Sequence, residues 1–251
     1  MATFSRSDDL RGAEFVGTDL SGARFVAADL ANVVMRGVDV LGADIDSPWL
    51  FEGGAVLVNG VDVVPLVEAE LNRRFPGRGD RRATDPDGLR AAWAALERAW
   101  AATLDRVAAM PPGTADVSVG GEWSFAQTVR HLVFATDVWL RRAVLRVADP
   151  YHPLGQPDGG SAREDVDLTF FATGTPPYAE VLRVRAERVA MVRGFLATAT
   201  PEVLTAERTS PWGSHAPMPT IACLHTILDE EWEHLRYAVR DLDAQGPITS
   251  G

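Results

Sequence analysis

Apolar residues recur at intervals of three and four in four long segments of the chain, the spacing that places side chains on one face of an α-helix. Asp85, Ser124 and Thr220 stand at the starts of three segments as capping residues, and Pro111 follows the first segment as a stop signal. We expect helices at residues 85–110, 124–149, 176–199 and 220–243. Four long helices with one long crossover predict a mainly α protein built on a four-helix bundle.

The first fifty residues follow a different period, with a large apolar residue at every fifth position and a small residue two places before nearly every one. The large residues are Leu10, Phe15, Leu20, Phe25, Leu30, Met35, Val40 and Ile45. A period of five fits neither a helix nor a strand. The units, such as "DLRGA", "DLSGA" and "DLANV", resemble the pentapeptide-repeat family, which implies a short right-handed β-solenoid of about two coils, with the large residues inside.

Two coils are too short to be stable alone, because each coil must bury its face on a neighbour. We therefore expect the solenoid to pack on the rest of the chain, as a structural cap rather than as the DNA mimic that long members of that family form. The domain boundaries predicted are 1–48 for the solenoid, 49–80 for a connector and 81–251 for the bundle. Within the connector, Asn59-Gly60 predicts a hairpin and Pro65 the start of a short helix.

Composition narrows the class of protein. The chain has 251 residues and a net charge of −11, which argues against non-specific binding to nucleic acid or anionic membranes. Its apolar runs are too short for a membrane span, and its N-terminus lacks the apolar core of a signal peptide, so we expect a cytoplasmic protein. The single cysteine, Cys223, excludes an intramolecular disulfide and a cysteine-based zinc site, and we expect it to be buried.

The last predicted helix carries polar residues where its apolar side should lie. Glu231 falls inside the apolar arc, and Glu230 and His234 fall at its edge, one turn apart. Burying such groups costs several kcal/mol unless they are paired. A carboxylate and an imidazole on adjacent turns are typical of a metal site in a helical bundle, with the third ligand supplied by another helix.

His131, in the second predicted helix, is the candidate for that third ligand. The other three histidines are excluded by position, since His152 and His215 lie in predicted loops and His225 on the predicted solvent-facing side of the last helix. Two imidazoles and a carboxylate suit zinc, with nickel as the alternative, better than magnesium.

Two stretches carry a resemblance to a known superfamily. "EWSFAQTVRHL" and "LHTILDEEWEHLRYAVRDL" resemble the metal-bearing helices of DinB-like proteins over residues 86–243. The resemblance implies His131, Glu230 and His234 as metal ligands. Glu230 stands where the commoner pattern has histidine, as in the branch of the mycothiol-dependent maleylpyruvate isomerases. That branch implies a metal-dependent transferase or isomerase that uses a low-molecular-weight thiol and a small-molecule substrate, with a homodimer left open.

Simpler interpretations stay open beside this one. His131 alone could be a histidine hydrogen-bonded inside the bundle, and Glu230 with His234 an ion pair of about 0.2–0.5 kcal/mol. Glu231 is interpreted as an acceptor that orients a ligand or as the partner of an arginine, with a role as alternative ligand left open. At the level of function, the alternative to an enzyme is a non-catalytic metal-binding or interaction protein in which the repeat segment docks a partner.

Overall fold

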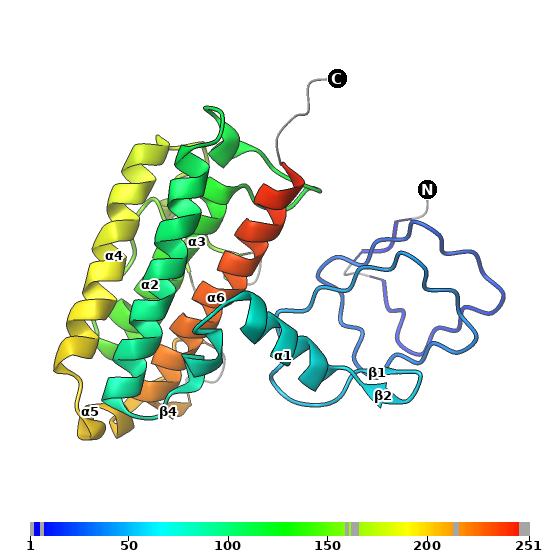
Figure 1. Cartoon of the computed structure of the whole chain (residues 1–251), viewed down its shortest axis with the longest axis horizontal. Coiled ribbons are helices and arrows are strands. Elements are labelled where there is room, and N and C mark those ends of the chain that lie inside the picture. Colours follow the sequence, from blue (N-terminus) through cyan, green and yellow to red (C-terminus); the bar gives the residue numbers. More distant parts are fainter. Residues whose placement is uncertain (1–2, 6–7, 159–160, 162–165, 213–215, 246–251) are drawn as a thin grey trace. The chain divides into compact units, whose positions relative to one another are not determined.

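The computed structural model describes residues 3–5, 8–158, 161, 166–212 and 216–245. It divides into two units, Met1–Asp46 and Ser47–Gly251, which are described separately. Figure 1 shows the first unit as a bent trace and the second as a group of long helices. Within the described residues, no helix is both long enough and apolar enough to cross a membrane.

The first unit is built from turns that repeat every ten residues. The carbonyls of Leu10, Leu20, Leu30 and Val40 each accept a hydrogen bond from the backbone N–H three residues on, at 2.9–3.1 Å. An aspartate precedes each turn, and its carboxylate accepts the N–H two residues on; these are Asp9, Asp19, Asp29 and Asp39. The backbone is left-handed at every fifth residue from Gly12 to Gly42. Local hydrogen bonds therefore set the corners of the repeat.

The expected interior of this unit is not closed. The large apolar side chains at every fifth position, from Leu10 to Ile45, are 44–75% exposed. The prediction that they fill a buried interior is therefore wrong. The physical reason is length, because each of about two coils has only one neighbour on which to bury its face. Whether the repeat packs on the second unit stays a prediction.

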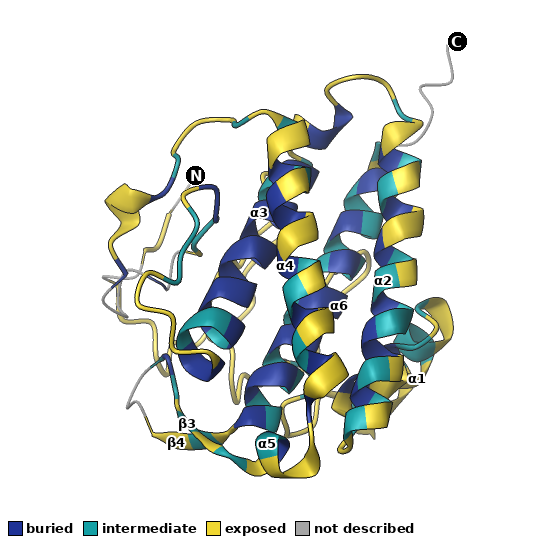
Figure 2. Ribbon diagram, turned by 90° about the vertical axis from the view of Figure 1, so that its left-hand side faces the viewer, coloured by how far each residue is buried: buried dark blue, intermediate teal, exposed yellow. Residues whose placement is uncertain are grey.

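The second unit contains the four predicted helices, which are confirmed. They are α2 (Pro86–Ala108), α3 (Phe125–Thr136), α4 (Tyr178–Thr198) and α6 (Thr220–Ala244). Helix α3 continues as a π-helical stretch, η3 (Asp137–Val144). The principal contacts run around a ring, from α2 to α4, α3, α6 and back to α2. Figure 2 shows the buried side of each helix turned toward the others.

Capping and burial explain why these segments are helical. Asp85 accepts the Gly88 N–H at the start of α2, and Ser124 with Gln127 forms a reciprocal capping box at the start of α3. The core between the helices is apolar, with Leu89, Leu96, Leu132, Ile227 and Leu235 at most 2% exposed. Helices α4 and α6 have no side-chain cap, and the prediction that Thr220 caps α6 is wrong, because α6 begins at Thr220 after Pro219. All four helices turn apolar side chains into one shared core.

The connector forms the hairpin and helix predicted for it. Strands β1 (Leu57–Val58) and β2 (Val61–Asp62) pair antiparallel across Asn59-Gly60, whose φ values of 51° and 82° suit the tight hairpin turn. Helix α1 (Val64–Arg74) follows, and then a 3₁₀ turn, η1 (Arg78–Arg82), which packs on α2 and α6.

That packing corrects the expected solvent-facing side of the last helix. No residue of α6 from Thr220 to Leu242 is exposed, and His225, Asp229 and Glu233 are half-buried. Arginines of η1 cover this side, because Arg81 and Arg82 pair with Asp229 at 3.3 and 2.6 Å. The 3₁₀ turn η1 therefore supplies the cations that the acidic side of α6 needs.

Short elements complete the second unit. A 3₁₀ turn, η2 (Thr114–Asp116), precedes α3, and another, η5 (Leu168–Phe170), lies in the long crossover. Between α4 and α6 lie α5 (Pro201–Thr205) and a pair of antiparallel strands, β3 (Glu207–Thr209) and β4 (Pro217–Pro219). The segment expected to be a loop before α6 is therefore partly a hairpin, while His215 and its neighbours 213–214 lie outside the described residues.

Candidate metal site

The three predicted ligands come together between α3 and α6. His131 lies in α3, and Glu230 and His234 lie one turn apart on α6; we call these three residues the triad. One ligand atom from each lies within 4.8 Å of the other two. His131 Nε2 is 3.3 Å from Glu230 Oε2, and the two imidazole rings stack with their centroids 4.6 Å apart. Small side-chain adjustments would let all three contact one ion at the usual distances near 2 Å.

Backbone carbonyls fix which imidazole nitrogens can act as ligands. His131 Nδ1 is 2.8 Å from the Gln156 carbonyl oxygen, and His234 Nδ1 is 2.7 Å from the Glu230 carbonyl oxygen. A carbonyl only accepts, so both Nδ1 atoms carry the hydrogen and both Nε2 atoms keep a lone pair. His131 Nε2 then faces a carboxylate oxygen, an arrangement that is favourable only with a proton or a cation between them. The donor set therefore fits a divalent metal ion.

Burial and mutual contact shift the pKa values of all three triad residues. Burial lowers the pKa of His131, but the hydrogen bond and charge of Glu230 outweigh burial, so its pKa is raised. Burial raises the pKa of Glu230, but contact with His131 lowers it below its usual value. Burial and the neighbouring His131 lower the pKa of His234 to about 4. Contact between His131 and Glu230 thus favours the charged form of each, whereas the lowered pKa of His234 favours its neutral imidazole, the form that can bind a metal.

Aromatic packing limits how far the imidazoles can turn. The Trp123 ring lies 4.9 Å from the His131 ring and 6.3 Å from the His234 ring, centroid to centroid. Tyr237 contacts His234 edge-on at 5.6 Å. The Trp123 ring therefore packs beside both imidazoles of the triad.

Arg130 holds the loop that supplies the Gln156 carbonyl. Its buried guanidinium donates to the carbonyls of Leu154, Ala172 and Gly174 at 2.9, 2.6 and 3.2 Å. Its own carbonyl accepts the Gln156 N–H at 3.1 Å. The residue beside His131 in the sequence therefore ties the long crossover to α3 and keeps the acceptor of His131 in place.

A buried ion pair anchors the same loop from its other end. Asp137 is 0% exposed and accepts the His152 N–H at 2.8 Å and Arg188 Nε at 2.6 Å. Asp137 lies where α3 changes to the π-helical stretch, and Arg188 comes from α4. Together with Arg130, this pair fixes residues 152–156 between α3 and α4.

Comparison with family models gives two matches that agree with this geometry. Residues 95–238 match the DinB superfamily, over more than half of the chain. The chain belongs to the DinB superfamily. The match includes all three residues of the triad, and residues 9–46 match pentapeptide repeats in eight copies. No curated protein and no solved structure matches the chain. Residues 47–94, which contain the connector, lie outside both matches.

Glu231 does not belong to the triad. Its side chain is 1% exposed and accepts Arg185 Nη2 at 2.6 Å. Burial raises the pKa of Glu231, although Arg185 opposes this effect. Because α4 and α6 stand opposite each other in the ring of helices, this ion pair crosses the core. Of the interpretations left open by the sequence, the structure selects the arginine partner.

A cleft of about 280 Å³ reaches two of the triad residues, Glu230 and His234. Its other walls are the face of α6 from Ala222 to Tyr237, Met218, Arg82 and the segment that contains Pro48, Trp49 and Glu52. The side chain of Glu230 is 32% exposed, so solvent reaches the triad from this side. Small molecules therefore have access to a metal ion held there.

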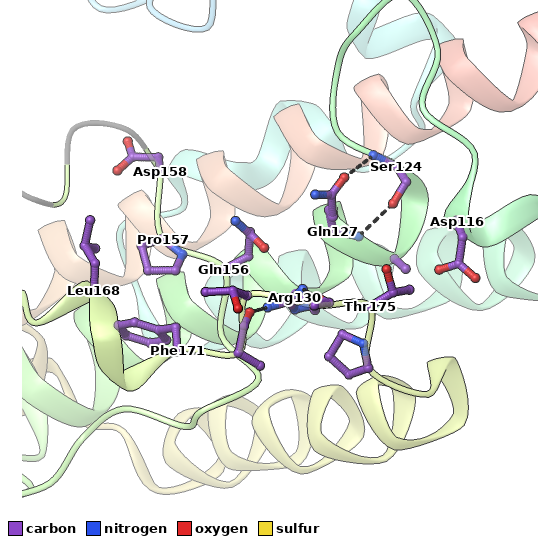
Figure 3. Close-up of a pocket in the computed structure, with 15 residues that line it drawn as sticks. Asp116, Ser124, Gln127, Arg130, Gln156, Pro157, Asp158, Leu168, Phe171 and Thr175 are labelled. Atoms are coloured by element: carbon purple, nitrogen blue, oxygen red, sulfur yellow. Dashed lines mark hydrogen bonds between the residues drawn. The ribbon is translucent and has the colours of Figure 1, made fainter.

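A larger cavity, of about 460 Å³, lies on another side of α3 and contains no triad residue. Figure 3 shows it between Ser124, Gln127 and Arg130 of the α3 region, Gln156 to Asp158, and Phe171 to Thr175 of the crossover. Arg130 and the capping pair are already engaged in protein hydrogen bonds. We therefore place the chemistry in the smaller cleft, which contains ligand atoms.

The other candidate residues have structural roles. His225 Nε2 is 2.9 Å from the Ala83 carbonyl oxygen, and His152 Nδ1 accepts the Leu154 N–H. Cys223 is 0% exposed, as predicted, and burial raises the pKa of its thiol to about 11. Trp232 is a core residue at 1% exposure, and Trp139 is half-buried beside Trp212.

Proposed function

We propose that this DinB-superfamily chain is a metal-dependent enzyme that uses a low-molecular-weight thiol, of the transferase or isomerase type. The observation that carries the proposal is the convergence of one imidazole nitrogen each from His131 and His234 and one Glu230 carboxylate oxygen, all within 4.8 Å of one another, with an accessible cleft beside them. Three protein ligands are the number found in catalytic zinc sites, which keep a position open for water or substrate.

His131, Glu230 and His234 would hold the ion, which we infer to be zinc, with nickel as the alternative, because two imidazoles suit borderline metals. A zinc ion so bound would lower the pKa of a water or thiol that contacts it. Other groups of the chain would hold these ligands in position. The Gln156 carbonyl orients His131, the Glu230 carbonyl orients His234, and Trp123 shields one side of the triad.

The reactive sulfur would come from the substrate. Cys223 is fully buried and its pKa is raised to about 11, so it supplies no thiolate near neutral pH. The cleft beside Glu230 and His234 is large enough for a small thiol or part of a larger one. This leaves a thiol that enters from solvent as the nucleophile.

One observation favours a second function, that of a non-catalytic metal-binding protein with the repeat segment as a docking module. The large side chains of the repeat, from Leu10 to Ile45, are 44–75% exposed, and such surfaces are typical of interaction sites. Both functions require the triad to bind metal, so metal content alone does not separate them. Binding of a thiol at the metal does.

The test uses full-length protein loaded with Co²⁺ as a spectroscopic substitute for zinc. We would titrate it with 2-mercaptoethanol and, separately, with the S-methyl ether of the same compound. The proposal expects a thiolate-to-cobalt charge-transfer band in the near ultraviolet with the thiol only. The band should be lost in His234→Ala and kept in His152→Ala, whose imidazole accepts the Leu154 N–H and does not line the cleft. Cobalt binding without the band would contradict the thiol enzyme and support the second function.

A further inference from the structure

The cleft beside the triad has a wall that neither matched region supplies. We call Pro48–Glu52 the connector turn. Its backbone is folded by hydrogen bonds from Leu50 N–H to the Ser47 carbonyl at 3.3 Å and from Glu52 N–H to the Trp49 carbonyl at 3.1 Å. Pro48, Trp49 and Glu52 line the cleft opposite α6. The DinB match begins only at residue 95, and the repeat match ends at residue 46. This wall therefore lies outside both matched regions.

Phe51 fixes the connector turn to the helical unit. The Arg78 guanidinium lies over the Phe51 ring, 4.8 Å from its centroid, and that of Arg81 lies at 5.8 Å. Both arginines are buried and reach α6, since Arg78 contacts Glu233 at 3.4 Å and Arg81 contacts Asp229 at 3.3 Å. A cation–π contact is stronger when the arginine is desolvated. The turn is thus held at a set place relative to the triad.

Charge pairing decides what the cleft offers to a ligand. Two of its carboxylates are engaged by arginines, Asp229 by Arg82 at 2.6 Å and Glu233 by Arg236 at 2.9 Å. Glu230 would face the metal. Trp49, in contrast, presents a large ring that is 68% exposed. Beyond the metal and the exposed Glu52 carboxylate, the large surface that the cleft offers to a ligand is therefore the flat, apolar Trp49 ring.

We propose that Trp49 is a specificity-determining residue of this cleft. It selects small molecules that combine a metal-binding donor atom with a flat, uncharged ring, the donor directed to the triad and the ring against the Trp49 indole. The inference rests on the proposed function only in requiring a metal ion with an open position. The volume of about 280 Å³ suits a donor group with one ring.

Two imidazole ligands test the proposal with Co²⁺-loaded, full-length protein. Imidazole and 4-phenylimidazole present the same donor, and only the second carries an added ring. The dissociation constants are measured from the visible cobalt bands for wild type, Trp49→Ala, Trp49→Phe and Leu66→Ala. Leu66 is the matched control, because it lies in α1 of the same connector, is 62% exposed and does not line the cleft.

The measured quantity is the ratio of the two dissociation constants, imidazole over 4-phenylimidazole. Trp49→Ala should lower this ratio about 2- to 10-fold while leaving the imidazole constant unchanged, as expected for loss of one aromatic contact. Trp49→Phe should keep most of the ratio, and Leu66→Ala all of it. An unchanged ratio in Trp49→Ala, with imidazole still binding, would overturn this inference alone. Failure of imidazole to change the cobalt spectrum would overturn the open metal position, and the inference would fall with it.

Discussion

The repeat unit, residues 1–46, and the helical unit, residues 47–251, use apolar side chains in opposite ways. In the helical unit, Leu89, Leu96 and Leu235 are at most 1% exposed and belong to one core. In the repeat unit, the equally regular Leu10 and Leu20 are each 44% exposed. A regular apolar period thus predicts a periodic backbone in both units but a buried core in only one.

The hydrogen bonds and ion pairs of polar side chains also differ between the two units. In the repeat, Asp19 and Asp29 contact backbone N–H groups two residues away, so each corner is specified locally. In the helical unit, polar groups reach far along the chain, since Asp137 pairs with Arg188 and Glu231 with Arg185. The comparison teaches that the repeat can form its turns before anything packs, whereas the geometry of the triad depends on the finished bundle.

The largest effect should come from breaking the buried ion pair between Arg185 of α4 and Glu231 of α6. Arg185→Met leaves the Glu231 carboxylate buried without its cation, so the free energy of unfolding should fall by about 3–5 kcal/mol at pH 7. Burial already raises the pKa of Glu231. The folded variant therefore takes up a proton before the unfolded chain does, and the loss should shrink as pH falls. Urea unfolding followed by circular dichroism at several pH values measures both.

The control for that variant is Arg183→Met, on the same helix. Arg183 pairs with Glu187, and both side chains are at least half exposed. Such a pair contributes at most about 1 kcal/mol. Equal losses in the two variants would show that α4 is held by its arginines in general, and not by the pair that crosses the core.

A leucine in each unit tests the difference in burial directly. Leu96→Ala removes a side chain that is 1% exposed and should lower the free energy of unfolding of the helical unit by about 2–5 kcal/mol. Leu20→Ala removes one that is 44% exposed, and we expect a local loss of less than about 1 kcal/mol, measured by exchange of the Ala23 amide hydrogen. A loss at Leu20 as large as at Leu96 would mean that the repeat has a buried interior after all.

Metal binding should stabilise the helical unit through all three triad residues. At a hundredfold excess of zinc over its dissociation constant, the wild type should gain about 2.7 kcal/mol. His131→Ala and His234→Ala should each lose most of this gain, and the double variant should lose no more, because the first change already removes the site. Thermal melts with zinc and with chelator measure this metal-dependent gain in stability for each variant.

His225→Ala is the matched histidine control for these melts. His225 lies on the same helix, but its imidazole contacts the Ala83 carbonyl. It should keep the full gain from zinc. If zinc raised the melting temperatures of wild type and the double variant equally, the triad would not be the metal site, and the proposed enzyme would lose its basis.

Much of the helical unit could be predicted because its determinants are local. The capping residues Asp85 and Ser124 and the apolar stripes indicate where α2 and α3 begin and which side is buried. The triad could be predicted because Glu230 and His234 are one turn apart, and because His131 was the one remaining candidate in a predicted helix. In each case the signal lies within one predicted helix or follows from the small number of histidines, five, in the chain.

What the sequence did not show depends on contacts between distant segments. The apolar pattern of the last helix shows that Glu231 falls on the apolar side. It does not indicate the partner of Glu231, Arg185, which lies 46 positions away. The carbonyl of Gln156 orients His131 through the backbone, for which no residue type is a signal. The acidic side of α6 was expected to face solvent because nothing in α6 indicates that the arginines of η1 cover it.

The smallest effect concerns one corner of the repeat. Gly22 has φ 73° and is the third residue of the turn closed between Ala23 and Leu20. Gly22→Ala places a Cβ in the left-handed region and should lower the free energy of opening this turn by about 1 kcal/mol. The chain supplies its own control, since Asn32 occupies the equivalent corner with φ 62°. Gly22→Asn should therefore cost less than Gly22→Ala, because asparagine tolerates this conformation better than alanine. Exchange of the Ala23 amide hydrogen measures both, with the Ala43 amide, two turns away, as the internal reference. If Gly22→Ala left the Ala23 amide unchanged, or loosened Ala43 equally, the corners would not be set locally and the contrast with the bundle would fail.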